Sequence, residues 1–399
     1  LPLRSCIISR LHLPGTHRSS SFMQTIMLEI VRAAHGGYGL AFADGMAVFV
    51  PYSFPGDRVR ASITLRKKNH AFAEIVDLIE PSTMRIAPEC PNFGRCGGCA
   101  YLGISYAHEL EIKRDILHEC VERIGGIRRD AMPPPLSIDG PRFGYRSHAT
   151  VKYEDGRTGL FAAGTSTLVP FPSSGCLLVS EGVNDALKEA PPAGLGEFRI
   201  AEDSTGRVFR SYEGDITLEE REAGIVYRRH ILGFFQANRF LRGKMLLAVG
   251  NLARLEPGTR FLDIGCGSGF FSLHLAKNWN RGTGIDRDRR SIFWARKNAR
   301  LNGIATVKFL VGDAGSFNTG TRTLDTVIVD PPRSGLSPGA RKAIMGVSPS
   351  RIVYVSCDPA TFARDLRVFI DAGYSTGGLT LIDMFPGTMH IETVCVLER

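Results

Sequence analysis

Short apolar runs divide this 399-residue chain into a strand-rich beginning and an end in which strands alternate with helices. In the beginning, apolar and polar positions alternate in four short segments separated by glycine, proline and aspartate turns, at 25–31, 46–50, 59–65 and 71–78. Strands of this length at this spacing are typical of a small all-β barrel. We therefore expect residues 24–81 to form an OB-like barrel.

Beyond residue 231, each apolar run ends at a glycine-rich turn, an acid or a cysteine, and helix-like segments follow several of them. The runs are 261–264, 282–285, 307–311, 326–329 and 352–355. This alternation predicts a doubly wound, mainly parallel sheet. Ligands of such sheets bind beyond the carboxyl ends of the strands, so we expect the residues after these runs to share one rim.

The region between them, residues 82–230, contains strand-like pieces, proline-rich breaks and a helix predicted over 104–124. We interpret it as a mixed α/β central domain that precedes a catalytic α/β domain at 231–399. Residues 1–23 are basic and serine-rich, and we expect a disordered extension, with a transit peptide as the alternative. The predicted fold class is α/β with a small all-β domain at its start.

The charge distribution favours a polyanionic partner. The chain carries a net charge of +9, and residues 231–310 hold 14 Lys and Arg against 4 Asp and Glu. A cluster at Arg287, Arg289, Arg290, Arg296, Lys297 and Arg300 falls on one predicted helix and its entry. Phosphate neutralisation dominates nucleic-acid binding, so we interpret this cluster as a nucleic-acid-facing surface, with a solvated helix face as the alternative.

Two absences in the sequence narrow the class of protein. No stretch of about 18 uncharged apolar residues occurs, so we expect no membrane span. The nine cysteines are odd in number and three of them cluster, which argues against a secreted disulfide framework and for a reduced compartment. We expect a cytoplasmic protein with no membrane partner.

A tight cysteine cluster lies in the central region, with Cys90, Cys96 and Cys99 within ten residues and two glycines inside the final C-x-x-C. Four thiolates are the usual complement for zinc or an iron–sulfur cluster. Cys176, in a polar turn beside a glycine, is our candidate for the fourth ligand, and Cys120, inside the predicted helix, is its rival.

The rim residues carry the candidate chemistry. The turn after Asp263 reads G-x-G-x-G, which is more typical of nucleoside–methionine binding than of pyrophosphate binding. Asp286 is placed to accept hydrogen bonds from a ribose, with a helix N-cap as its alternative role. Asp313 is placed to meet an adenine amino group. Cys357 at the end of 352–355 is either a buried core residue or a nucleophile.

Three motifs carry a family resemblance: D-P-P-R-S-G at 330–335, S-C-D-P at 356–359, and M-F-P-G-T-M-H-I-E at 384–392. From about residue 24 to 399 the chain resembles bacterial RNA uracil-5-methyltransferases of the class I, S-adenosylmethionine-dependent type. Within that family it is similar to the branch with an N-terminal TRAM barrel and a [4Fe-4S] cluster, which methylates 23S ribosomal RNA.

The resemblance implies roles for particular residues. It makes Cys357 the nucleophile and Glu392 the proton acceptor. It implies S-adenosylmethionine contacts from Gln236, Gly265, Phe270, Asp286, Asp313 and Asp330, and ligation of a [4Fe-4S] cluster by Cys90, Cys96, Cys99 and Cys176.

The resemblance also implies the substrate. We expect methylation of carbon 5 of a uridine in RNA, most of all 23S rRNA, and no action on DNA. The sequence leaves the oligomeric state open, and we favour a monomer. Two alternatives remain open: a transfer RNA uracil-5-methyltransferase, and an RNA-binding factor with a degenerate methyltransferase domain.

Overall fold

The computed structural model describes residues 25–132, 134–278, 280–315 and 324–399, and the predicted extension at 1–23 lies outside them. The chain forms two compact units, each described here by itself. The first contains residues up to 116, 152–177 and 387–389, and the second contains 117–151, 178–386 and 390–399. Residues 82–230, which we predict as one central domain, are thus shared between the two units, so the predicted boundaries at 81 and 230 remain predictions.

The first unit opens with a six-stranded sheet, counted over the described residues, in the order β1-β5-β6-β4-β3-β2. Its strands are β1 (Thr25–Glu29), β2 (Arg32–Ala34), β3 (Tyr38–Ala43), β4 (Met46–Pro51), β5 (Arg58–Arg66) and β6 (His70–Glu80). Alternate positions such as Val48, Val50, Val59 and Ala61 are buried in its core. The structure agrees with the four predicted strands, and β2 and β3 are strands that the prediction treated partly as a glycine turn.

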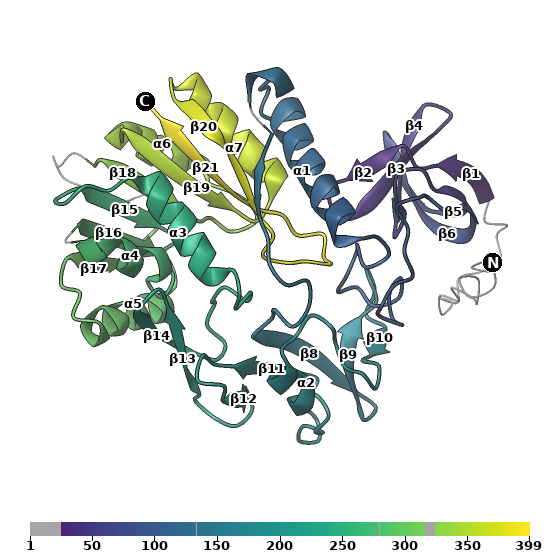
Figure 1. The fold of residues 1–399 in the computed structure, drawn as a ribbon, viewed down its shortest axis with the longest axis horizontal. Coiled ribbons are helices and arrows are strands. Elements are labelled where there is room, and N and C mark those ends of the chain that lie inside the picture. The colour runs from purple at the N-terminus through teal and green to yellow at the C-terminus, as the bar shows by residue number, and fades with distance from the viewer. Residues whose placement is uncertain (1–24, 133, 279, 316–323) are drawn as a thin grey trace. The chain divides into compact units, whose positions relative to one another are not determined.

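The same unit also contains the cysteine-rich loop and a hairpin (Figure 1). The hairpin strands β9 (Arg157–Phe161) and β10 (Leu168–Pro170) pair antiparallel. Helix α1 (Tyr106–Arg123) begins in the first unit and ends in the second, close to the predicted 104–124. Strand β8 (His148–Glu154) crosses between the units in the opposite sense, and its last residues pair with β9.

The second unit is built on a sheet with the order β17-β16-β15-β18-β19-β21-β20-β7, eight strands in the described ranges. The strands are β7 (Leu136–Ile138), β15 (Arg260–Ile264), β16 (Arg281–Asp286), β17 (Val307–Val311), β18 (Thr326–Val329), β19 (Arg351–Ser356), β20 (Ser375–Ile382) and β21 (Glu392–Glu398). Pairing from β17 to β19 is parallel, and β21 runs antiparallel to both β19 and β20. This is the predicted doubly wound sheet, with an antiparallel addition.

Helices connect the parallel strands of this sheet (Figure 1). They are α4 (Phe270–Leu275), α5 (Arg289–Leu301), α6 (Pro338–Val347) and α7 (Pro359–Asp371), and α3 (Arg242–Ala253) precedes β15. Right-handed crossovers that run outward from β15 in opposite directions place α4 and α5 on one face and α6 and α7 on the other. The strands are buried on both sides, which explains why they appear in the sequence as continuous apolar runs.

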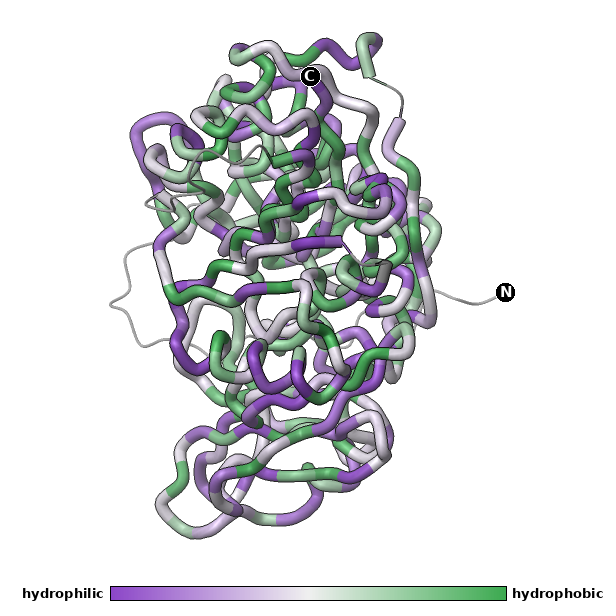
Figure 2. Tube along the Cα trace, turned by 90° about the vertical axis from the view of Figure 1, so that its left-hand side faces the viewer, coloured by the Kyte–Doolittle hydropathy of each residue, from purple (hydrophilic) through white to green (hydrophobic). Residues whose placement is uncertain are grey.

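Smaller elements precede the sheet in this unit: the one-turn helix Arg129–Ala131, α2 (Glu181–Ala186), β11 (Glu197–Glu202), β12 (Val208–Arg210), β13 (Thr217–Glu222) and β14 (Ile225–His230). Strands β13 and β14 form a hairpin whose Tyr227 packs into the core of the sheet domain. Figure 2 shows apolar and polar positions interspersed along the trace. Among the described residues, no helix is long and apolar enough to cross a membrane.

Candidate active site

The glycine-rich turn lies at the point where the strand order of the sheet reverses. β15 pairs with β16 on one side and β18 on the other, and the crevice beyond such a point is where ligands bind in open α/β sheets. Gly265 turns the chain at φ +81°, and a Cβ there would lie 2.5 Å from the carbonyl oxygen of Asp330. Glycine at this position therefore permits both the left-handed conformation and the close approach of two strand ends.

Asp286 holds the turn in place. Its carboxylate accepts hydrogen bonds from the backbone N–H of Gly267 and of Asp288, each at 2.9 Å. The N-cap of α5 is Asp288, which accepts from the N–H groups of Arg290 and Ser291. The alternative role proposed for Asp286, a helix N-cap, therefore belongs to its neighbour. Asp286 is partly exposed at the end of β16.

Asp313 follows β17, the edge strand next to β16. Its Oδ1 accepts a hydrogen bond from the N–H of Gly315 at 2.6 Å, and its other oxygen pairs with Arg287. Arg287 directly follows Asp286, so the ion pair joins the loops after two neighbouring strands. Asp286 and Asp313, the two acids predicted to contact a nucleoside, thus lie in neighbouring loops at the rim.

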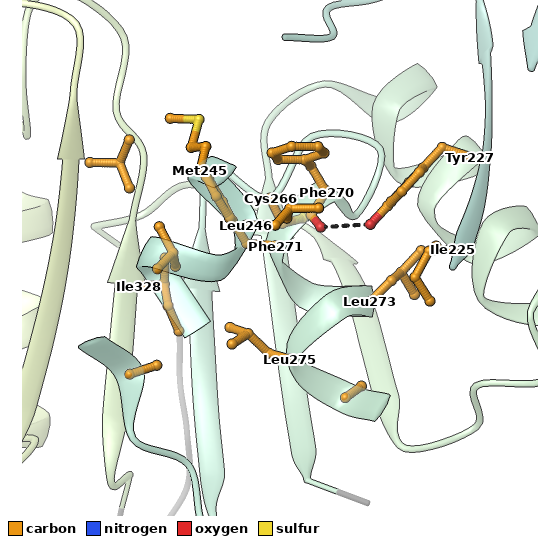
Figure 3. Close-up of a cluster of buried hydrophobic side chains, with 14 of the residues drawn as sticks. Ile225, Tyr227, Met245, Leu246, Cys266, Phe270, Phe271, Leu273, Leu275 and Ile328 are labelled. Carbon is orange, nitrogen blue, oxygen red and sulfur yellow. Dashed lines mark hydrogen bonds between the residues drawn. The ribbon is translucent and has the colours of Figure 1, made fainter. Parts of the chain in front are cut away.

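Phe270 begins α4 directly after the turn, and Gln236 lies in the loop after β14. Phe270 accepts a hydrogen bond at its carbonyl oxygen from the hydroxyl of Tyr227 at 3.0 Å (Figure 3). Its ring packs edge-on against Phe235, the residue before Gln236. Gln236 is 5 % exposed, and the adjacent Asn238 donates to the carbonyl oxygen of Met384 at 3.1 Å. This loop is therefore bonded to the segment that leads to Glu392.

Three carboxyl groups gather beneath the turn. Burial, opposed by the hydroxyl of Ser272, raises the pKa of Asp263 to about 7. Burial and the charges of Asp263 and Asp286 raise the pKa of Asp330 to about 7. Like charges this close disfavour ionisation of one another. A cation bound at the rim would offset these like charges and favour the ionised forms of Asp263 and Asp330.

Cys357 and Glu392 come together through the register of β19 and β21. Ser356, the last residue of β19, pairs with Thr393, and the next residues outward are Cys357 and Glu392. Cys357 is partly exposed, whereas Glu392 is 4 % exposed. Asp358 caps α7 by accepting from the N–H of Thr361 at 2.8 Å, with Pro359 in the first turn. The cysteine thus lies between a strand end and a helix start and is not a core residue.

The charges around this pair act in opposite directions. Burial, followed by the charges of Glu392 and Asp330, raises the pKa of the Cys357 thiol to about 12. Burial and Asp330 raise the pKa of Glu392 well above its ordinary range. Arg333 lowers the pKa of both groups. Cys357, Glu392 and Asp330 therefore lie within electrostatic reach of one another.

Arg333 and His390 are site residues to which the sequence reasoning gave no role. The guanidinium Nη2 of Arg333 lies 3.1 Å from the ring nitrogens of His390, so the loop after β18 contacts the segment before β21. Both residues stand inside the motifs at 330–335 and 384–392, which was the available signal. Their sequence spacing of 57 residues hides the contact, because β19 and α7 lie between them.

The four predicted cluster cysteines all belong to the first unit, and none forms a disulfide. The loop that carries Cys96 pairs with the β9–β10 hairpin: Gly97 donates to the carbonyl oxygen of Phe161, and Asn92 donates to that of Pro170. A Cβ at Gly97 would lie 2.8 Å from the carbonyl oxygen of Phe161, so the loop and hairpin are in close contact. Cys176 follows this hairpin in the chain.

The thiols influence one another. Burial raises the pKa of Cys96, and Cys176 and Cys90 raise it further. Cys96 and Cys99 both raise the pKa of Tyr52, which reaches about 12 mainly through burial. The rival, Cys120, is buried in α1 with Glu119 and Asp358 as its charged neighbours. Over the residues that the structure describes, no group of three or more His, Cys, Asp or Glu side chains has the arrangement of a metal site.

The fold and the rim define a class I type methyltransferase domain preceded by a β-rich domain. Residues 213–399 match the family described as tRNA (Uracil-5-)-methyltransferase, and residues 26–84 match the TRAM domain of tRNA (uracil(54)-C(5))-methyltransferase. The chain is 31% identical to a 23S rRNA (uracil(1939)-C(5))-methyltransferase RlmD of Alkalilimnicola ehrlichii, over 96% of this chain and 99% of that protein. It belongs to the RNA uracil-5-methyltransferase family and is a S-adenosylmethionine-dependent enzyme acting on RNA.

Two further similarities are consistent with this family. An uncharacterised RNA methyltransferase of Halalkalibacterium halodurans is 30% identical, over 91% of this chain and 94% of that one. The structure of the Pyrococcus abyssi tRNA (uracil-54, C5)-methyltransferase, in complex with S-adenosyl-L-homocysteine, has a TM-score of 0.73 at 24% identity. It covers 93% of this chain and 100% of that one, and it shows the shared fold.

Proposed function

We propose that this enzyme methylates carbon 5 of a uridine in 23S rRNA through a covalent bond between Cys357 Sγ and carbon 6 of the uracil. One observation carries the proposal: the β19–β21 register puts Cys357 next to Glu392, and Asp330 and Arg333 influence both. A thiol beside a carboxyl at the mouth of a methyl-donor site is the pair that this chemistry needs.

The proposed steps use each residue once. Carbon 5 of uracil is a poor nucleophile, so the thiolate of Cys357 first adds to carbon 6 and gives an enolate. Carbon 5 then attacks the methyl group of S-adenosylmethionine, which leaves as S-adenosylhomocysteine. Glu392 removes the proton from carbon 5, and the electron pair of that C–H bond restores the double bond and expels the thiolate. The target base has to leave its stack to reach the site.

We assign the methyl donor to the rim. Gly265 would allow the close approach of the cofactor. Asp286 would accept hydrogen bonds from a ribose, Asp313 would accept one from an adenine amino group, and Asp330 would offset the charge of the sulfonium. Phe270 and Gln236 would contact the same molecule. The raised pKa of Asp330 supports this assignment, since a nearby cation would restore its ionised form.

The choice of 23S rRNA over transfer RNA is supported by the relatives named RlmD in Alkalilimnicola ehrlichii and Methylococcus capsulatus, 31% and 30% identical. A transfer RNA substrate is favoured by the name of the Pyrococcus abyssi protein, whose fold this chain shares at 24% identity. We favour 23S rRNA because those relatives are more similar in sequence. Mapping 5-methyluridine in total RNA from cells with and without the protein separates the two, and loss from tRNA alone contradicts the proposal.

We further propose that Cys90, Cys96, Cys99 and Cys176 hold a [4Fe-4S] cluster. The chemistry of the donor set supports it: there are four thiols, none in a disulfide. Three lie on one loop, and the fourth lies in the segment after the hairpin that pairs with this loop. The charges of Cys176 and Cys90 raise the pKa of Cys96, so these thiols lie within electrostatic reach of one another, and a metal would displace their protons on binding. When bound, the cluster would tie the loop to the hairpin.

The covalent step has a direct test. RNA that carries 5-fluorouridine cannot lose a proton from carbon 5, so the adduct should accumulate when S-adenosylmethionine is present. We expect a complex that survives denaturation with the wild-type protein and none with Cys357→Ala. A stable complex formed by Cys357→Ala would show that another residue is the nucleophile.

A further inference from the structure

Helix α5 carries a basic surface that the methyl-transfer chemistry does not use. A hollow of about 540 Å³ runs along α5 and the end of β17, and it is lined by Arg289, Phe293, Arg296, Lys297, Arg300 and Val311. Each of the five helical members has another member three or four positions away, so they share one face of α5. Because β17 is the edge strand, this surface lies at the end of the sheet away from Cys357.

Three of the four cations in the hollow are available to an external anion. Arg296 donates from Nε and Nη2 to the carbonyl oxygen of Phe309, at 3.0 and 2.7 Å, and so holds the helix to β17. Arg289, Lys297 and Arg300 are exposed and form no ion pair with any described residue. The charges therefore repel one another in the free protein and are offset when a polyanion binds.

The charges at the start of α5 do not favour the helix, although Arg300, in its last turn, does. Arg289 and Arg290 occupy the first turn, where the helix dipole disfavours positive charge, and the first turn contains no acid. Asp288 compensates in part as the N-cap. A solvated surface has no need for cations in this position, so their placement points to a ligand.

An exposed aromatic ring lies among the cations. Phe293 is 50 % exposed, and the Nζ of Lys297 lies 4.4 Å from its ring centroid. Leu310 and Val311 on β17 are exposed as well, at 46 % and 44 %. Cations that neutralise phosphates beside an aromatic face that stacks bases are the two components of single-stranded nucleic-acid binding.

We propose that this α5 surface binds an unpaired segment of the RNA substrate several nucleotides from the target uridine. Four strand spacings separate β17 from β19, and at about 4.8 Å each they amount to roughly 19 Å. The surface is therefore too far from Cys357 to touch the methylated base. This inference rests on RNA being the substrate, and it adds a second contact that makes affinity depend on the length of the RNA.

The experiment compares two triple variants of the full-length protein. R289Q/K297Q/R300Q removes the three available cations, and R128Q/K188Q/R207Q removes three exposed cations that are paired with acids elsewhere. Binding of a 23S rRNA fragment that spans the methylated uridine is measured across a range of salt concentrations. We expect the first variant to bind on the order of tenfold more weakly at 0.15 M salt. The slope of log K against log salt concentration should become less steep by about 2. The second variant should bind as the wild type does.

Replacements of Phe293 test the stacking part without a change of charge. F293L should weaken binding of the same 23S rRNA fragment, and F293Y should retain it, because stacking needs an aromatic face. Thermal melting establishes that each variant is folded, and K297Q alone serves if the triple variant is not.

The proposal fails if R289Q/K297Q/R300Q keeps the wild-type affinity and slope, or if the control triple weakens binding equally. It also fails if the surface binds an acidic protein and not RNA. Methyl incorporation by the wild-type protein is measured separately. If R289Q/K297Q/R300Q binds RNA more weakly but the wild type does not methylate it, the proposed function is refuted and the assignment of RNA binding to the α5 surface stands.

Discussion

Glu392 lies across from Cys357, one step beyond the Ser356–Thr393 pair of two antiparallel strands. Both groups have a raised pKa, and the same arginine, Arg333, opposes the rise in each. Burial thus disfavours the charged forms of both the thiol and the carboxyl in the absence of substrate. Activation has to come from positive charge, either Arg333 or the sulfonium of the methyl donor.

Glu392→Gln should separate methyl transfer from product release. The amide cannot accept the carbon 5 proton, and general base catalysis typically contributes 10²–10⁴-fold. We therefore expect methylated RNA to stay bonded to Cys357 and turnover to fall at least 100-fold. The fraction of protein that migrates with RNA on a denaturing gel measures it. Glu398→Gln, at the far end of the same strand, is the matched control, and normal turnover in Glu392→Gln would rule out the assignment.

Arg333→Gln should make the enzyme require a higher pH. Loss of the guanidinium removes a positive charge that lowers the pKa of Cys357, so the thiolate forms at higher pH. The rate of methyl incorporation, measured from pH 6 to 10, should fall most at the acid end. Arg333→Lys keeps a positive charge, so its pH profile should shift less than that of Arg333→Gln. A profile of unchanged shape would show that Arg333 acts through structure alone.

S-adenosylmethionine should lower the pKa of the Cys357 thiol from the value of about 12 in the free enzyme. The sulfonium cation would offset the charges of Asp330 and its neighbours, whereas the neutral thioether of S-adenosylhomocysteine would not. The rate of alkylation by iodoacetamide, followed against pH by mass spectrometry of the Cys357 peptide, reports the thiolate. Equal curves with the two ligands would argue against a sulfonium near the thiol.

Asp263→Asn should flatten the pH dependence of stability. The folded pKa of Asp263 is about 7, above its ordinary value, so the native state retains a proton that the unfolded chain releases. The contribution of Asp263 to the free energy of unfolding is therefore fully present below about pH 4. It is lost as the pH rises to about 7, by roughly 4 kcal/mol at most. Melting temperatures at pH 5 and pH 8 should differ less in Asp263→Asn than in the wild type. An undiminished difference would mean that another group titrates.

Cys176→Ser should lose the metal centre, and Cys120→Ser should keep it. Anaerobically purified wild-type protein should be brown and contain iron and sulfide. Cys176 raises the pKa of Cys96, one of the other proposed ligands, whereas the charged groups that act on Cys120 are Glu119 and Asp358. Cys120→Ser is therefore the matched control for Cys176→Ser. Iron and zinc analysis measures the outcome. Stoichiometric zinc without iron would replace the iron–sulfur assignment by a zinc site.

The regular parts of the fold follow from local patterns. The runs at 261–264, 282–285, 307–311, 326–329 and 352–355 coincide with β15 to β19, since strands buried on both faces need continuous apolar residues. The short strand β7 was not recognisable, because three residues with an exposed Leu136 carry no periodic signal. Its place at the sheet edge depends on pairing with β20, far away in the sequence.

The sequence by itself determined which residues form the rim, because each of them follows an apolar run within a few positions. These residues are Gly265, Asp286, Asp313, Asp330 and Cys357. Only the tertiary structure decided how these ends act on one another. The antiparallel register of β21 brings Glu392 to Cys357, and the loop after β18 brings Arg333 to His390. The physical reason is that burial and nearby charge set each pKa, and both depend on residues that the chain separates by tens of positions.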